Sequence, residues 1–278
     1  MRLKTPLFLI ALLIVCGLFS EKSFYHHATQ ETIKPSVVKQ NKNITILSFA
    51  TDPKHCMLKL LTASSPYPVE ILGKNKKWRS HRDKLEAVKR YLSKKNLRNS
   101  DKIIMFVDGY DTFFAPGNQD IIKKFHSFHK PIVISAEIGC WPFHTPACID
   151  KKLYPKSPTP FQYVNSGTYI GYASAIYKML KEVLHDHPQQ RDDQYMLHDY
   201  FINHPDRVAL DYHQEIFSLL YETNLNNYHY DNQTGFISNL ITHSTPVVFH
   251  GNGPFPVKQL LLNLHAMAYK TAGGCDNY

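Results

Sequence analysis

The chain has 278 residues, of which 43% are hydrophobic and 20% are charged. This composition excludes a wholly disordered or fibrous protein and predicts one large domain or two small ones. The net charge of +9 suits nucleic acid, an anionic membrane surface or a phosphorylated ligand, but no zinc-finger spacing or aromatic RNA-binding motif accompanies it, so we expect no nucleic-acid partner.

The first 20 residues are predicted to be a targeting segment rather than part of the fold. Arg2 and Lys4 precede an uncharged apolar run of about 15 residues, which is short for a membrane span of ~20 residues. It fits a signal peptide or an uncleaved signal anchor; we favour the anchor, because no small-x-small cleavage site follows. Both interpretations place the remaining chain in the secretory pathway, either held by a single membrane pass (in the endoplasmic reticulum or Golgi lumen of a eukaryote) or secreted.

Residues 21–43 are polar and without a clear period, which predicts a stem or linker. The folded domain is therefore expected over residues 44–278. Four cysteines lie beyond the apolar segment, an even number that permits disulfides and agrees with export. They allow three pairings, among which the sequence does not choose, and none has the CxxC spacing of a zinc site: Cys56, Cys140, Cys148 and Cys275.

Apolar runs typical of strands alternate with helical patterns from residue 44 onward. Strands are predicted over 44–50, 69–72, 102–107, 131–136, 163–172 (around a glycine turn) and 246–249. Helices are predicted over 81–94, 176–184 and 194–202. We expect the lysines and arginines of the first helix to lie on its solvated face. The alternation indicates an α/β fold with a mainly parallel sheet.

Polar clusters lie at the ends of the predicted strands, where open α/β sheets bind ligands. The first cluster puts Asp108 and Asp111 on a turn directly after the apolar run KIIMFV. Two carboxylates at this spacing can converge on Mg²⁺ or Mn²⁺, with substrate phosphates completing the coordination shell. Aspartates are also common in turns for conformational reasons alone, so the pair is a weak signal by itself.

The second cluster, HGNGP, follows the last predicted strand. Its glycines would let backbone N–H groups approach and hold phosphate oxygens. His250 is a candidate third metal ligand through a neutral imidazole nitrogen, and Lys258 is a candidate cation for a diphosphate. The ordinary alternatives are a hydrogen-bonded histidine at a strand end and an exposed helix lysine.

The third cluster, Asp192 and Asp193, opens a predicted helix. The pair either caps the helix or forms an acidic wall that binds sugar hydroxyls and stabilises an electron-poor anomeric carbon. Glu137 and Trp141 belong with it, because a tryptophan beside an acidic residue suits a sugar face; a core tryptophan is as common, and Trp78 has the same ambiguity. Together the clusters call for a ligand with a diphosphate, a divalent metal and a sugar, which a nucleotide-sugar glycosyltransferase uses.

The sequence resembles the glycosyltransferase domain of procollagen lysyl hydroxylases over roughly residues 43–269. Six blocks carry the resemblance in order and approximate spacing: IIMFVDGYDTFF, SAEIGCWP, YVNSGTYIGYA, DDQ, LDYHQEIFSLL and PVVFHGNGP. The resemblance implies a GT-A fold, a single Rossmann-like α/β domain that uses Mn²⁺ and a UDP-sugar. It also implies that Asp108, Asp111 and His250 are the metal ligands.

The same resemblance implies further site residues. The nucleotide contacts would be Tyr110, Asn252, Gly253 and Lys258, together with Thr51 and Trp78. The acceptor-side and catalytic positions would be Trp141, Asp192 and Asp193, with Asn165 nearby.

The chain departs from the family pattern in three places. Animal members carry a longer aspartate run at Asp192 and Asp193, and two extra residues separate Pro254 from Lys258. The chain also ends at Tyr278, without room for the iron- and 2-oxoglutarate-dependent hydroxylase domain of the full-length enzymes. We therefore expect glycosyl transfer without lysine hydroxylation.

The resemblance implies retaining transfer of a hexose, with glucose favoured, from UDP-glucose or UDP-galactose to galactosyl-hydroxylysine of collagen-like chains. One alternative is a glycosyltransferase for another glycoprotein or a surface polysaccharide, which the shortened acidic run leaves open. The other is a non-catalytic sugar-binding scaffold, against which the intact Asp108, Asp111 and His250 argue.

Overall fold

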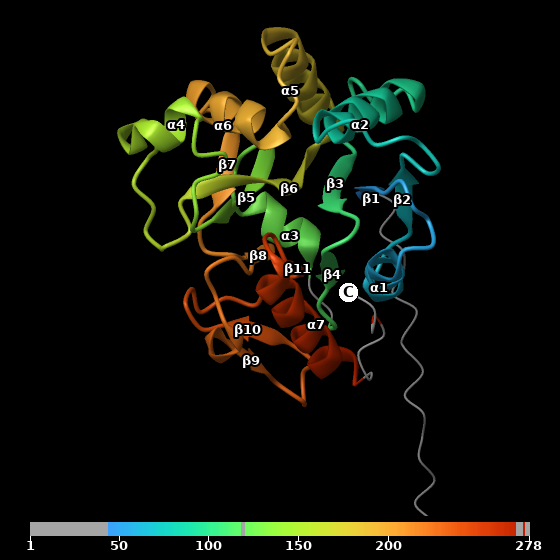
Figure 1. Cartoon of the computed structure of the whole chain (residues 1–278), viewed down its shortest axis with the longest axis vertical. Coiled ribbons are helices and arrows are strands. Elements are labelled where there is room, and N and C mark those ends of the chain that lie inside the picture. The colour runs from blue at the N-terminus through green and yellow to red at the C-terminus, as the bar shows by residue number, and fades with distance from the viewer. Residues whose placement is uncertain (1–43, 118–119, 271–274, 276–278) are drawn as a thin grey trace, which may run out of the picture. The chain divides into compact units, whose positions relative to one another are not determined.

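The structure, a computed structural model, describes residues 44–117, 120–270 and 275 (Figure 1). The targeting segment and stem expected before residue 44 lie outside the described residues. Within the described residues, no helix combines the length and the apolar character that a membrane crossing requires.

A six-stranded sheet forms the centre, in the order β2-β1-β3-β6-β5-β7. Its strands are β1 (Ile44–Phe49), β2 (Val69–Leu72), β3 (Ile103–Asp108), β5 (Ile132–Glu137), β6 (Tyr163–Tyr172) and β7 (Val208–Asp211). All run parallel except β6, which is antiparallel to both of its neighbours. The mainly parallel sheet is therefore confirmed, and the α/β fold class with it.

One detail of the strand prediction is wrong. Residues 163–172 form a continuous strand, not a strand around a glycine turn. The irregularity lies instead in the pairing with β5, where the register shifts between Ile134 and Ser135. A glycine is needed at position 167 because of its neighbours: a Cβ there would lie 2.8 Å from Asp108 Oδ2 and would overlap the His250 ring.

Helices cover both faces of the sheet (Figure 1). They are α1 (Cys56–Ser64), α2 (Arg82–Lys94), α3 (Ile121–His126), α4 (Pro146–Ile149), α5 (Ala173–Asp186), α6 (Asp193–Asn203) and α7 (Phe255–Tyr269), with short 3₁₀ helices at Lys151–Leu153 and Leu225–Asn227. The helices predicted over 81–94, 176–184 and 194–202 correspond to α2, α5 and α6.

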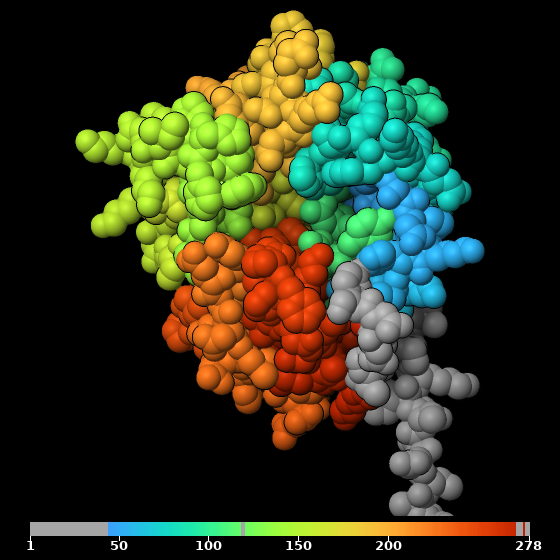
Figure 2. All heavy atoms as spheres, in the orientation of Figure 1, coloured from blue at the N-terminus to red at the C-terminus, as the bar shows by residue number. Residues whose placement is uncertain are grey.

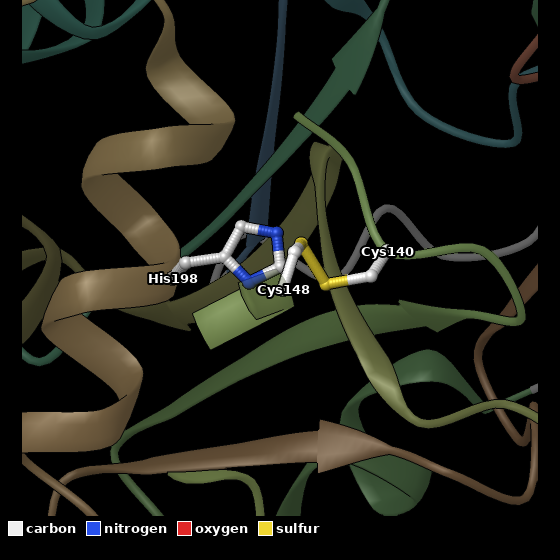
Figure 3. A group of neighbouring side chains, drawn as sticks. All are labelled: Cys140, Cys148 and His198. Atoms are coloured by element: carbon white, nitrogen blue, oxygen red, sulfur yellow. A yellow bond between two sulfur atoms is a disulfide. The ribbon is translucent and has the colours of Figure 1, made fainter. Parts of the chain in front are cut away.

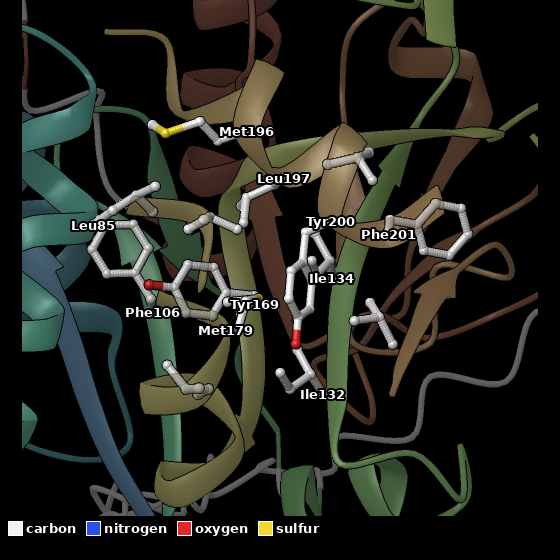
Figure 4. Close-up of a cluster of buried hydrophobic side chains, with 14 of the residues drawn as sticks. Leu85, Phe106, Ile132, Ile134, Tyr169, Met179, Met196, Leu197, Tyr200 and Phe201 are labelled. Atoms are coloured by element: carbon white, nitrogen blue, oxygen red, sulfur yellow. The ribbon is translucent and has the colours of Figure 1, made fainter. Parts of the chain in front are cut away.

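Each strand contributes alternate side chains to two different cores, because successive residues point to opposite faces. In β3, Ile104 and Phe106 pack with α2, α5 and α6, while Met105 and Val107 pack with α1 and α3. Figure 4 shows part of the first core, where the rings of Phe106 and Tyr169 stack at 5.1 Å. Burial on both faces explains why these strands read as continuous apolar runs.

Two smaller sheets complete the fold. The predicted strand at residues 246–249 lies in a three-stranded sheet, β4 (Thr112–Phe114), β11 (Val248–His250) and β8 (Phe217–Leu219), in the order β4-β11-β8. A two-stranded sheet joins β9 (Tyr228–Tyr230) and β10 (Ile237–Asn239). Because β4 follows β3 after a turn, its pairing with β11 brings the second sheet to the end of the first.

The two disulfides correspond to one of the three cysteine pairings that the sequence left open. Cys140 is bonded to Cys148, and Cys56 is bonded to Cys275. Structural disulfides of this kind persist in oxidising compartments.

Candidate active site

A cavity of about 550 Å³ lies beyond the carboxyl ends of β3, β5 and β11. Figure 2 shows this face hollowed near its middle, where segments far apart in the sequence meet. Ten of the residues that the sequence singled out line the cavity: Asp108, Asp111, Glu137, Trp141, Asn165, Asp192, Asp193, His250, Asn252 and Gly253.

The two aspartates and the histidine predicted to bind metal converge. One ligand atom from each of Asp108, Asp111 and His250 lies within 4.8 Å of the others. His250 Nε2 is 3.4 Å from Asp111 Oδ1 and 3.9 Å from Asp108 Oδ2. The pairing of β11 with β4 brings them together, since the N–H of Gly251 donates to the carbonyl of Asp111 at 2.8 Å.

Electrostatics distinguish the three groups. Burial raises the pKa of Asp108, and the nearby charge of Lys84 offsets only part of that effect. Burial also opposes ionisation of Asp111, but His250 together with Lys258 and Lys84 more than compensates, so the Asp111 pKa is lowered. In turn the His250 pKa is raised by Asp111, against the opposing effect of burial. Two carboxylate oxygens and one imidazole nitrogen form a donor set that suits a divalent metal cation.

Lys84 corrects the expectation for the basic face of the first helix. Its side chain is buried, and Nζ lies 3.0 Å from Asp108 Oδ1 and 2.9 Å from Asp193 Oδ2. Burial disfavours its charge, yet the two carboxylates more than compensate and raise the Lys84 pKa. A sequence signal existed: Lys84 precedes Val88 by four residues and so shares the apolar face of the helix.

Glu137, at the end of β5, holds a buried network together. Its carboxylate accepts hydrogen bonds from the side-chain amides of Asn165 (3.2 Å), Gln194 (2.6 Å) and Asn252 (2.6 Å). Burial raises the pKa of Glu137 to about 7, although these three donors act in the opposite direction. Asn165 and Asn252 therefore line the cavity with their amides directed at Glu137.

Both interpretations of the Asp192–Asp193 pair have structural support. Asp192 caps α6 by accepting a hydrogen bond from the N–H of Tyr195 at 2.9 Å, and it also lines the cavity. Asp193 is buried and pairs with Lys84. Trp141 is 53% exposed and lines the cavity, so it is not a core tryptophan.

The remaining predicted residues lie outside the cavity lining. The Tyr110 hydroxyl accepts a hydrogen bond from the N–H of Asp52 at 2.7 Å and lies 3.4 Å from Thr51 Oγ1. Trp78 is 42% exposed and packs against His81, which does line the cavity. Lys258 lies in the first turn of α7. Burial raises the Asp111 pKa, and the charge of Lys258 helps His250, which has the larger effect, to lower it.

Comparison with solved structures found a crystal structure of a glycosyltransferase involved in the glycosylation of the major capsid of PBCV-1. The TM-score is 0.48 and the identity 11%, over 78% of this chain and 98% of the other.

Curated relatives are more similar in sequence. An uncharacterized protein of Acanthamoeba polyphaga mimivirus is 33% identical over 69% of this chain and 41% of its own length. The procollagen-lysine,2-oxoglutarate 5-dioxygenase 1 of Gallus gallus is 27% identical over 78% of this chain and 31% of its own. The multifunctional procollagen lysine hydroxylase and glycosyltransferase LH3 of Homo sapiens is 28% identical over 84% and 33%. The chain thus spans less than half the length of these relatives.

A family model described as the PLOD GT domain matches residues 40–275, which is most of the chain and contains all of the described site. The resemblance inferred from the six sequence blocks is confirmed, and the chain belongs to the PLOD GT domain family.

Proposed function

We propose that this member of the family is a metal-dependent, retaining glycosyltransferase that moves a hexose from a UDP-sugar to an acceptor hydroxyl. The observation that carries the proposal is the convergence of Asp108, Asp111 and His250 in a cavity walled on another side by Asp192 and Asp193. We favour UDP-glucose as donor, with UDP-galactose as the alternative, and galactosyl-hydroxylysine of collagen-like chains as acceptor. Both choices rest on the family.

Asp108, Asp111 and His250 would hold Mn²⁺, since their donor set suits that cation and leaves positions for diphosphate oxygens. When bound, the cation supplies Lewis-acid stabilisation of the leaving diphosphate.

The nucleotide side is assigned to residues next to the metal ligands. Thr51, Trp78 and Tyr110 follow β1, β2 and β3, respectively, at this end of the sheet. We propose that they contact the nucleotide. Asn252, Gly253 and Lys258 lie beyond β11 and would face the diphosphate. The N–H of Gly251 already donates to Asp111, so we exclude it from the diphosphate contacts.

The acceptor side is assigned to the other wall. Asp192 lines the cavity from the start of α6, where its carboxylate is available to accept hydrogen bonds from sugar hydroxyls. Lys84 forms ion pairs with both Asp108 and Asp193. Its ammonium group therefore lies between the proposed metal site and the acidic wall. We propose that Asp192 and Asp193 orient the acceptor and support the electron-poor anomeric centre.

The test is UDP release by the purified full-length protein with Mn²⁺, using UDP-glucose and UDP-galactose with and without a galactosyl-hydroxylysine peptide. We expect metal-dependent release that the peptide stimulates. Asp111→Asn should lower the rate by roughly 10²–10³-fold, the usual effect of losing one well-placed electrostatic group. Asp206→Asn, at an exposed aspartate outside the cavity lining, is the matched control and should keep the wild-type rate.

The other outcomes separate the alternatives. Release without stimulation by the peptide would retain the enzyme class and favour another glycoprotein or a surface polysaccharide as acceptor. No release with either donor from folded protein would contradict the proposal and favour a non-catalytic sugar-binding scaffold. Wild-type turnover by Asp111→Asn would contradict the metal assignment.

We also propose that the protein works in the secretory pathway, attached to or released from a membrane according to whether its N-terminal segment is cleaved. The two disulfides support an oxidising compartment.

A further inference from the structure

An aromatic pair stands at the rim of the cavity. Trp141 and Phe143, on the loop between β5 and α4, both line the cavity and remain 53% and 70% exposed. Their rings meet edge to face, with centroids 4.9 Å apart. The family resemblance placed Trp141 on the acceptor side and said nothing of Phe143.

The loop that carries this pair is held rigidly at its base. The Cys140–Cys148 disulfide closes it, and His198 reaches toward the disulfide from α6 (Figure 3). The backbone carbonyl of Trp141 accepts two hydrogen bonds from α6, from Gln194 Nε2 at 2.8 Å and from His198 Nε2 at 2.7 Å.

His198 continues this contact into the core. Its Nδ1 is hydrogen-bonded to the Tyr154 hydroxyl, which also accepts the N–H of Val164 at 3.2 Å. In the neutral ring, Nε2 donates to the Trp141 carbonyl and Nδ1 accepts from the Tyr154 hydroxyl. Burial lowers the pKa of His198 to about 4, which keeps the ring in this form at neutral pH.

Cys140, Cys148 and His198 also bring ligand atoms within 4.8 Å of one another. They do not form a metal site in this state, because the two sulfur atoms are bonded to each other and both ring nitrogens have hydrogen-bond partners. The group acts as a tether that sets the position of the Trp141 backbone.

We propose that Phe143 joins Trp141, which the family resemblance already assigned to the acceptor side, in a platform for the apolar face of a neutral pyranose ring in the acceptor, and that His198 is a positioning residue for this platform. The proposal deepens the proposed function and rests on it. Aromatic surface beside a few polar groups is the usual composition of a small-molecule site, and here the carboxylate of Asp192 lines the same cavity to accept the hydroxyls of the ring.

The sheet order supports an acceptor rather than a donor at this place. The platform follows β5, whereas Thr51 and Tyr110, assigned to the nucleotide, follow β1 and β3. Because β6 lies between β3 and β5, the loop after β3 starts two strand spacings, about 10 Å, from the loop that carries the platform. The loop after β1 starts one strand farther away.

The test measures acceptor binding apart from turnover. The chain has two tryptophans, so a Trp78→Phe background leaves Trp141 as the only indole reporter. Its fluorescence is followed during titration with a galactosyl-hydroxylysine peptide and with the same peptide lacking galactose. In this background Phe143→Ala should weaken binding of the galactosylated peptide by roughly 3–10-fold, the usual range for one aromatic contact. Phe143→Tyr should restore the affinity.

Leu240→Ala is the control, because Leu240 is exposed and outside the cavity lining. A change of less than twofold for Phe143→Ala relative to this control would overturn the platform. An equal loss for both peptides would overturn the sugar as its occupant. Absence of UDP release in every variant, wild type included, would contradict the proposed function, while the fluorescence titration would still decide the platform.

The positioning role has its own measurement. His198→Leu removes one hydrogen bond to the Trp141 carbonyl and should raise the acceptor KM several-fold more than it lowers kcat. His198→Gln retains one donor and one acceptor and should recover the KM. Equal acceptor KM values in both variants and the wild type would refute the positioning role. If His198→Leu does not fold, the Cys140→Ser/Cys148→Ser variant removes the other anchor of the same loop, and its acceptor KM relative to kcat is compared with the wild type instead.

Discussion

Lys84 has an environment that is unusual for a lysine, because its side chain is buried. Lysines are almost never fully buried unless they are paired, and this one lies between the carboxylates of Asp108 and Asp193. The two acceptors raise its pKa against the effect of burial. Its charge therefore links a proposed metal ligand to the acidic start of α6.

Substitution of Lys84 by Met should destabilise the protein by about 3–5 kcal/mol, because it leaves buried carboxylates without their cation. Adding Asp193→Asn should recover part of the loss, since the second carboxylate no longer needs a partner. Urea unfolding of the two single variants and the double variant at pH 7 measures this coupling.

Arg90→Met, at an exposed position of the same helix, is the control and should stay within about 0.5 kcal/mol of the wild type. Strictly additive losses in the double variant would show that Lys84 and Asp193 do not depend on each other.

At the scale of elements, α6 connects the two halves of the site. Asp192 caps it, Asp193 pairs with Lys84 in its first turn, and Gln194 and His198, four residues apart, donate to the same carbonyl of Trp141. Residues at this spacing lie on one face of a helix, so a single rigid element carries the acidic wall and supports the aromatic platform.

The buried neutral His198 on this helix predicts a specific acid sensitivity. Its pKa is about 4 in the folded protein against 6.5 in the unfolded chain. Between these values the unfolded chain binds a proton that the folded chain does not, so stability is full above pH 6.5 and falls as the pH drops toward 4. At pH 5 the loss from this group should be about 2 kcal/mol.

Urea unfolding at pH 7 and pH 5 tests this. His198→Gln cannot titrate in this range and should lose less stability than the wild type over the same interval. If the two proteins lose the same amount, His198 is not neutral in the fold.

At the scale of the whole molecule, the Cys56–Cys275 disulfide joins the start of α1 to residue 275, across a sequence separation of 219. Both cysteines belong to the apolar cluster around α7 or pack against it. A bond that closes so long a loop removes much conformational freedom from the unfolded chain.

Replacing both residues, Cys56→Ala/Cys275→Ala, should lower the free energy of unfolding by about 2–5 kcal/mol. The Cys140–Cys148 disulfide closes a much shorter loop, with a sequence separation of 8. The Cys140→Ala/Cys148→Ala variant should therefore lose less unfolding free energy. Thermal unfolding with and without reductant provides the measurement. A stability ranking in the opposite order would contradict this loop-length argument.

Local sequence patterns predicted the central sheet because its strands are buried on both faces. The expected strand at 102–107 is found as β3 (Ile103–Asp108), and that at 131–136 as β5 (Ile132–Glu137). β4, β8, β9 and β10 were not predicted, because each has three residues and is too short to show a period. Four helices were also missed, namely α1, α3, α4 and α7.

The sequence by itself determined the fold class and the family, because the buried strands read as apolar runs and the six blocks keep their order. It also selected Asp108, Asp111 and His250 as candidate metal ligands, an assignment that stays a prediction. Only the tertiary structure decided the contacts between distant segments. The pairing of β11 with β4 brings His250 to the aspartates, the fold buries Lys84 between two carboxylates, and the cysteines take one pairing of three. Periodicity shows which face of an element is apolar, but which partners lie across that face depends on how the elements pack.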